Sequence, residues 1–174
     1  ELTLGASVDN YFDLRSVFHL SEDDFEIEEA YATTRALPYH LQGKIGKFKS
    51  DFGYLNNKHK HNYNFADTPL IYQSLLGNHG LNETGAQLQY VFPAPHYLMA
   101  GIEVFQGENE QSFGADGFAP HEAGEDFEGV EKVSQPGLWV AYVKSSFDMG
   151  GGTWLGGVSM AKGESRMDHL EDEV

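Results

Sequence analysis

Two histidines at alternate positions, His59 and His61, are the residues whose type and spacing most directly suggest chemistry. Asp67 and His79 fall in the same predicted loop, so imidazole and carboxylate groups are available to hold a zinc or copper ion. The competing interpretation is an exposed polar loop, because interleaved lysines at 58 and 60 repel a cation. We expect no cofactor and keep His59 and His61 as candidate metal ligands.

Acidic pairs and a glycine run are the other candidates for chemistry. Glu103 and Glu108 have the groups of a hydrolase acid and base, but nothing in the sequence fixes their separation or builds a pocket. The run Gly150-Gly151-Gly152 lacks the lysine and the helix of a phosphate-binding loop, and it fits a turn. We therefore predict no catalytic residue and no enzyme.

The elements that carry these residues are predicted to be strands, because apolar and polar residues alternate over most of the chain. Tight turns are expected at Asp9, Pro38, Pro95 and Gly150, and longer connections join the resulting hairpins at their other end. This pattern predicts an all-β fold, an antiparallel up-and-down transmembrane β-barrel with about eight strands present. Because both chain ends fall on the long-loop side, we expect a segment of a larger barrel.

Two long connections divide residues 1–174 of the predicted barrel segment. Residues 51–85 are expected to form a constriction-type loop with a short helix from Pro69 to Leu76, ended by Gly77. Its residues Leu70, Ile71 and Leu75 are expected to anchor the helix on the inner wall. Residues 107–135 carry eight carboxylates against Lys132 and are expected to form an acidic extracellular loop.

Composition narrows the classes of protein that fit the chain. The 174 residues carry a formal charge of −16, which argues against a nucleic-acid partner. The chain has no cysteine, so it has neither disulfides nor thiolate metal sites. No apolar run is long enough for a transmembrane helix, but a transmembrane strand needs only about 9 to 11 residues with alternate ones apolar.

Alternation also assigns the two faces of the predicted sheet. Polar residues on the face opposite the apolar set are expected to line a pore, and their acidic excess favours cations. In the constriction loop the expected residues are Asp67, Pro69 and Tyr72. The last hairpin is expected to place Leu138, Val140, Tyr142, Trp154, Val158 and Met160 outward. The expected pore-lining residues are Asp13, Arg15, His19, Glu26, Glu28, Gln42, Lys44, Gln87, Gln89 and Glu103.

One feature of the outer face is anomalous. A turn around Pro38 that pairs residues whose numbers sum to about 76 places Glu29 opposite Lys47, on the face that carries Phe25 and Ile27. Because a lone charge facing lipid is costly, we predict a cross-strand ion pair between these two residues.

The run FEIEEAYATTRALPYHLQGKIGKFKSDFGYLNN resembles the strand-turn-strand block of the phosphate- and polyphosphate-selective porin superfamily of Gram-negative bacteria. The following KHKHNYNFADTPLIYQSLLG is similar to an uncharacterised porin-like branch of outer-membrane proteins. The resemblance covers about Phe25 to Gly107, and it implies that the loop 51–85 folds into the barrel and narrows it. Phosphate selectivity is not expected, because only Arg15, Arg35 and Arg166 are present.

The resemblance and the pattern together predict a porin-like channel in the cell outer membrane of a Gram-negative bacterium. Small hydrophilic solutes or ions would diffuse through it. Its expected partners are outer-membrane lipid and lipopolysaccharide, and two further copies of itself in a homotrimer. No nucleic-acid partner is expected. The alternative is a soluble or surface-exposed β-sandwich or β-barrel binding module, with a metal at His59 and His61; alternation alone does not separate inside from outside.

Overall fold

A computed structural model describes residues 2–20, 25–59, 63, 67–77, 79–107, 109, 112–113 and 137–163. They form one antiparallel sheet of eight strands in sequence order, together with a helix α1 (Leu70–Leu76) and a single 3₁₀ turn (Pro38–His40). The predicted all-β, up-and-down arrangement is confirmed. The strands are β1 (Leu2–Val8), β2 (Phe12–Leu20), β3 (Phe25–Thr34), β4 (Leu41–Lys49), β5 (Asn82–Val91), β6 (Tyr97–Phe105), β7 (Leu138–Met149) and β8 (Gly152–Gly163).

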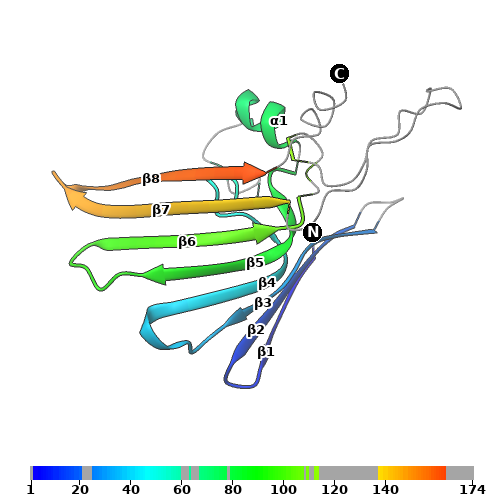
Figure 1. Ribbon diagram of the computed structural model, residues 1–174, viewed down its shortest axis with the longest axis horizontal. Helices are drawn as coiled ribbons and strands as arrows, with labels where there is room; N and C mark the ends of the chain where they lie inside the picture. Colours follow the sequence, from blue (N-terminus) through cyan, green and yellow to red (C-terminus); the bar gives the residue numbers. More distant parts are fainter. Residues whose placement is uncertain are drawn as a thin grey trace, which may run out of the picture.

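The sheet is open, because β1 and β8 are its two edges and do not pair with each other. Figure 1 shows the tight turns at one end of the curved sheet and α1 at the other. The turn residues explain the short connections: Asp9, Tyr39, Gly150 and Gly151 all have positive φ, between 58° and 81°. Three of the four predicted tight turns contain these residues, and the fourth, at Pro95, joins β5 and β6 through residues 92–96.

The two faces of the sheet differ in what covers them. Antiparallel partners share a face, so the register assigns every strand residue to one side. The inner face, which carries Phe48, Glu103 and Tyr142, is covered in part by the connection 50–81 between β4 and β5. The outer face remains exposed and almost wholly apolar, with Ile45 64% and Val158 77% exposed.

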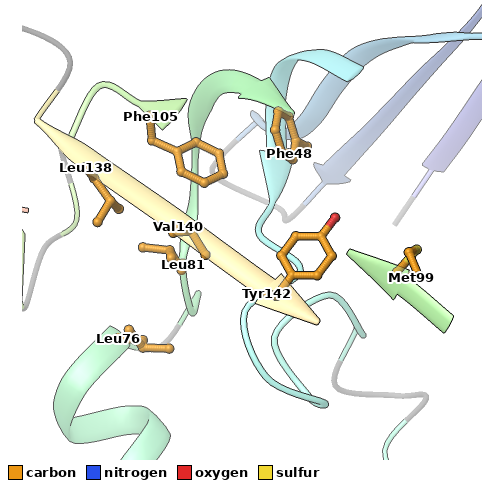
Figure 2. Packing of buried hydrophobic residues seen from close by; sticks show 8 residues of the cluster. All are labelled: Phe48, Leu76, Leu81, Met99, Phe105, Leu138, Val140 and Tyr142. Carbon is orange, nitrogen blue, oxygen red and sulfur yellow. The ribbon is translucent and has the colours of Figure 1, made fainter. Parts of the chain in front are cut away.

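A hydrophobic cluster fixes the connection 50–81 to the inner face. Phe48 and Phe105 lie with ring centroids 5.1 Å apart, and Leu76 of α1 and Leu81 of the connection pack against the same cluster. Figure 2 shows these side chains together with those of β6 and β7. The two ends of the connection are also joined, because Asn56 Nδ2 donates to Ser50 O at 2.8 Å and to Leu81 O at 2.9 Å. The connection is thus a packed element of the fold.

The predicted register of β3 and β4 is wrong by one residue. Lys47 lies opposite Ala30, and Glu29 is buried on the inner face. A separate bulge lies in β3, where Val17 pairs with Glu29 and Phe18 with Ile27, so that Glu28 is skipped and Glu29 and Ile27 lie on opposite faces. The predicted ion pair between Glu29 and Lys47 is therefore contradicted; Lys47 Nζ instead donates to Ile27 O at 2.8 Å.

The predicted facing of β7 is also wrong. Leu138, Val140 and Tyr142 are buried on the inner face, while Trp139 and Val143 face outward. Both parities of β7 are apolar because one packs under the connection and the other is on the exposed face. On β8 the predicted outward residues are exposed on the outer face, namely Trp154, Val158 and Met160.

The predicted short helix is present, but the residue that it buries is not one of the three that were expected to anchor it. Pro69 is the N-cap and Gly77 the C-cap, and Leu76 is buried, whereas Leu70, Ile71 and Leu75 are exposed. The connection ends at residue 81, before the predicted boundary at 85, because β5 begins at Asn82. Most of the predicted acidic loop 107–135 lies outside the described residues.

Candidate functional site on the inner face

Asp51 is the centre of a polar cluster between the connection 50–81 and four strands, β4 to β7. It follows β4 by two residues, at the point where the chain turns over the inner face. Its Oδ1 lies 3.0 Å from Lys144 Nζ of β7, and its Oδ2 lies 4.0 Å from Lys44 Nζ of β4. Asn57 of the same connection donates to Asp51 Oδ1 at 2.7 Å. One carboxylate therefore links β4 and β7.

Glu103 of β6 is the second carboxylate of the cluster and has no exposed surface. Its Oε2 accepts a hydrogen bond from Ser50 Oγ, and its Oε1 accepts one from Asp51 N at 2.9 Å. Gln87 Nε2 of β5 donates to Glu103 Oε1 at 2.6 Å and to Asp51 Oδ2 at 2.8 Å. The two carboxylates are thus joined through one amide group.

The electrostatics of Asp51 show that the charged form is favoured. Burial acts to raise the pKa of its carboxyl group, but the charge and hydrogen bond of Lys144, with further help from Lys44 and Gln87, hold the pKa below its ordinary value of 3.8. Two lysines offset the two carboxylates, and each donor or acceptor is engaged within the cluster. This arrangement suits attachment of a loop better than turnover of a substrate.

A second polar cluster surrounds His59, one of the two candidate metal ligands. His59 Nδ1 lies 3.4 Å from Glu28 Oε1, and Nε2 lies 3.9 Å from Glu29 Oε2. Lys49 Nζ is 2.7 Å from Glu28 Oε1 and supplies a positive charge to this cluster. His61 lies outside the described residues, and the part of the chain that the structure describes contains no group of three or more potential ligands placed to hold a metal. The metal site stays a prediction.

The predicted pore-lining residues separate into those that contact other polar groups on the covered part of the inner face and those that are exposed. Lys44, Gln87 and Glu103 belong to the Asp51 cluster, while Gln89 Nε2 donates to Gln42 Oε1 beside it. The carboxylate of Glu28 contacts Lys49 and His59. The remaining residues are exposed on the inner face of β1–β3, and among the described residues none of these four forms a hydrogen bond to the connection: Asp13, Arg15, His19 and Glu26.

The three predicted constriction residues lie on the segment leading into α1. Asp67 is exposed, Pro69 accepts a hydrogen bond from the backbone of Tyr72 at 2.9 Å, and Tyr72 is half-buried against the hydrophobic cluster. Tyr72 thus contacts the inner-face core, and Asp67 does not reach the Asp51 cluster.

Sequence reasoning missed three residues of the Asp51 cluster: Ser50, Asp51 and Lys144. Ser50 and Asp51 were assigned to a connection, where nothing in the letters indicates a partner. Lys144 could have been found, because it has the parity of Tyr142 in β7; correct facing of that strand would have placed it on the inner face.

Comparison with known proteins gives one informative relative. An uncharacterised protein of Aquifex aeolicus (strain VF5) is 50% identical over 173 residues. These cover 99% of this chain and 36% of the relative, so the chain spans about a third of that protein's length. No family model and no solved structure matches the chain. Within the described residues no helix is both long and apolar enough to cross a membrane.

Proposed function

We propose that this chain forms part of a transmembrane β-barrel that acts as an outer-membrane, porin-like channel for small hydrophilic solutes. The observation that carries the proposal is the outer face, which is apolar and exposed across all eight strands. Soluble proteins rarely expose a continuous apolar patch larger than a few hundred Å². A soluble β-sandwich module would need a polar exposed face. Exposed apolar residues of the outer face include Leu4, Leu14, Ile27, Ile45, Leu88, Ile102, Val143 and Val158.

Aromatic residues at the two ends of the outer face support the same proposal. Phe147 and Trp154 lie opposite each other on β7 and β8 near the tight turns. At the same end of the sheet the ring centroids of Tyr90 and Phe92 are 4.6 Å apart. Trp139 lies near the other end of β7, eight residues from Phe147. That separation is about 27 Å along the strand, or about 21 Å across a membrane at a tilt of about 40°. Outer-membrane barrels have an apolar band of about 25 Å between aromatic girdles.

The inner face supports a channel rather than a solid membrane anchor. Polar and charged residues alternate with the outward apolar ones, and the connection 50–81 packs on this face, as in porins whose inward loop narrows the barrel. The resemblance of residues 25–107 to the porin superfamily agrees with this. The open edges of β1 and β8 and the greater length of the Aquifex relative support closure of the barrel by further strands of a longer polypeptide.

Reconstitution of the intact polypeptide, with the further strands that would close the barrel, tests the proposal directly. We expect it to require detergent for extraction, and to give discrete conductance steps when added to a planar lipid bilayer in KCl. A matched control is a variant with Ile45→Glu and Val158→Glu, which places two carboxylates on the lipid-facing surface and should abolish insertion. A protein that is folded and monodisperse without detergent, and that gives no conductance, would refute the proposal.

A further inference from the structure

The connection 50–81 covers only one part of the inner face. Its hydrogen bonds and ion pairs reach β3 to β8, as in His59 to Glu29, Asp51 to Lys144, and Gly53 N to Ser159 Oγ at 2.9 Å. Most inner residues of β6 and those of the first half of β7 are buried beneath it, and Val140 is 2% exposed, whereas the inner residues of β8 are half-buried or exposed. The middle of the face is therefore filled by protein.

The inner face of β1 and of β2 as far as Arg15 is open by comparison, while Val17 further along β2 is buried. Every residue of β1 is exposed, and Gly5, Asp13 and Arg15 are exposed on the inner side of the β1–β2 hairpin. A side chain at Gly5 would meet nothing closer than Leu14 O at 3.9 Å. Space for water therefore lies along β1 and the start of β2 and not over the buried residues of β6 and β7.

The chemistry of this open surface is polar and nearly balanced in charge. Ser7 Oγ donates to Asp13 Oδ1 at 2.7 Å, and Arg35 Nε lies 3.5 Å from Asp13 Oδ2. Arg15 contributes a further positive charge and Glu26 a further negative one, the latter 3.8 Å from Lys47 Nζ. The sequence-based expectation that the pore prefers cations counted Glu28 and Glu103 among the pore-lining residues. Both carboxylates instead bind other protein groups on the part of the inner face that the connection covers. An acidic excess on the open surface is therefore absent among the described residues.

We infer that solutes pass along the inner face of β1, β2 and the start of β3, past Thr3, Ser7, Asp13, Arg15 and Glu26, and that this path admits small uncharged or zwitterionic hydrophilic solutes with little preference between cations and anions. Hydroxyl groups and paired charges of both signs can replace water around such solutes, and they leave no strong electrostatic barrier to either ion. This inference rests on the proposed channel function.

Single cysteines test the path, because the chain has none of its own. Gly5→Cys places a thiol on the open inner surface, Ala6→Cys places one on the adjacent outer surface, and Val140→Cys places one beneath the connection. Each variant is reconstituted in a planar bilayer and treated with a water-soluble, positively charged methanethiosulfonate reagent. We expect a stepwise loss of conductance for Gly5→Cys, and none for the other two.

The outcomes separate this inference from the channel itself. The unmodified protein conducts in two contrary outcomes: the reagent fails to reduce the conductance of Gly5→Cys, or it reduces that of Val140→Cys. Either result overturns the path but agrees with the proposed channel function. Absence of conductance in the unmodified protein overturns both. For the solute class, we expect a reversal potential near zero in a KCl gradient. A potential close to the equilibrium value for K⁺ or for Cl⁻ would overturn the weak selectivity.

Discussion

Replacing Asp51 with Asn should release the connection 50–81 from β7. The side chain of Asn has the same shape, but it is uncharged, and its NH₂ group would face the donors Lys144 Nζ or Gln87 Nε2, which now bind carboxylate oxygens. Two lysines would then lack their counter-charge. The consequence is a less stable protein whose connection is less firmly held.

The size of the effect follows from the burial of the pair. Removing one partner of a fully buried ion pair costs about 3–5 kcal/mol, and an exposed pair is worth about 0–1 kcal/mol. The side chains of Asp51 and Lys144 are 11% and 16% exposed, so the pair is close to the buried limit without reaching it. We therefore expect Asp51→Asn to lower the free energy of unfolding by about 2–3 kcal/mol.

Urea unfolding of the protein in detergent micelles, followed by tryptophan fluorescence, measures this change. Asp13→Asn is the matched control, because Asp13 pairs with Arg35 at 3.5 Å and both side chains are about half exposed; it should cost less than about 1 kcal/mol. Combining Asp51→Asn with Lys144→Met should cost less than the sum of the two single changes. Equal effects of Asp51→Asn and Asp13→Asn, with additive behaviour of the double variant, would refute the reasoning.

Three further predictions concern pH, backbone and pore. Because the pKa of Asp51 is held below 3.8, its contribution to the free energy of unfolding should be fully present above that pH and be lost as the pH falls through the lowered pKa. Urea titrations should show that the difference in stability between the protein and Asp51→Asn disappears at that low pH. Gly46→Ala should destabilise the protein by more than about 2 kcal/mol, since φ is 128° and a Cβ would lie within 3 Å of Ala30 O, whereas Gly156→Ala has open space and should be nearly neutral in the same assay. Deleting residues 57–82 should raise single-channel conductance, and unchanged conductance would place this segment outside the path.

The strands were predictable from sequence because each one alternates between a polar and an apolar face, and the turns carry residues suited to positive φ. The register of β3 was not predictable in the same way. The bulge at Glu28 changes the phase of the strand, and the letters FEIEEAY contain no signal for the skipped residue. The facing of β7 failed for a different reason: both faces of its first half are apolar, so alternation carries no information over residues 138–143.

The candidate site was only half predictable. Gln87, Glu103 and Lys44 were placed on the inner face by parity alone, and the structure brings them together. Asp51 could not be assigned, because its role depends on the connection returning across three strands, and that contact is set by the packing of Leu76 and Leu81. Local pattern predicts the strands, whereas the attachment of the connection depends on contacts between residues far apart in the chain.

The sequential strand order also bears on how such a chain can change in evolution. Since each strand pairs only with its neighbours in the sequence, a hairpin can be duplicated or lost by a single genetic event while the remaining pairs keep their register. The carboxylate at 51 removes that freedom from the middle of the sheet, because it requires β4 and β7 to stay at a fixed distance. Gain or loss of hairpins, and with it the circumference of the proposed barrel, should therefore be concentrated outside the block from β4 to β7.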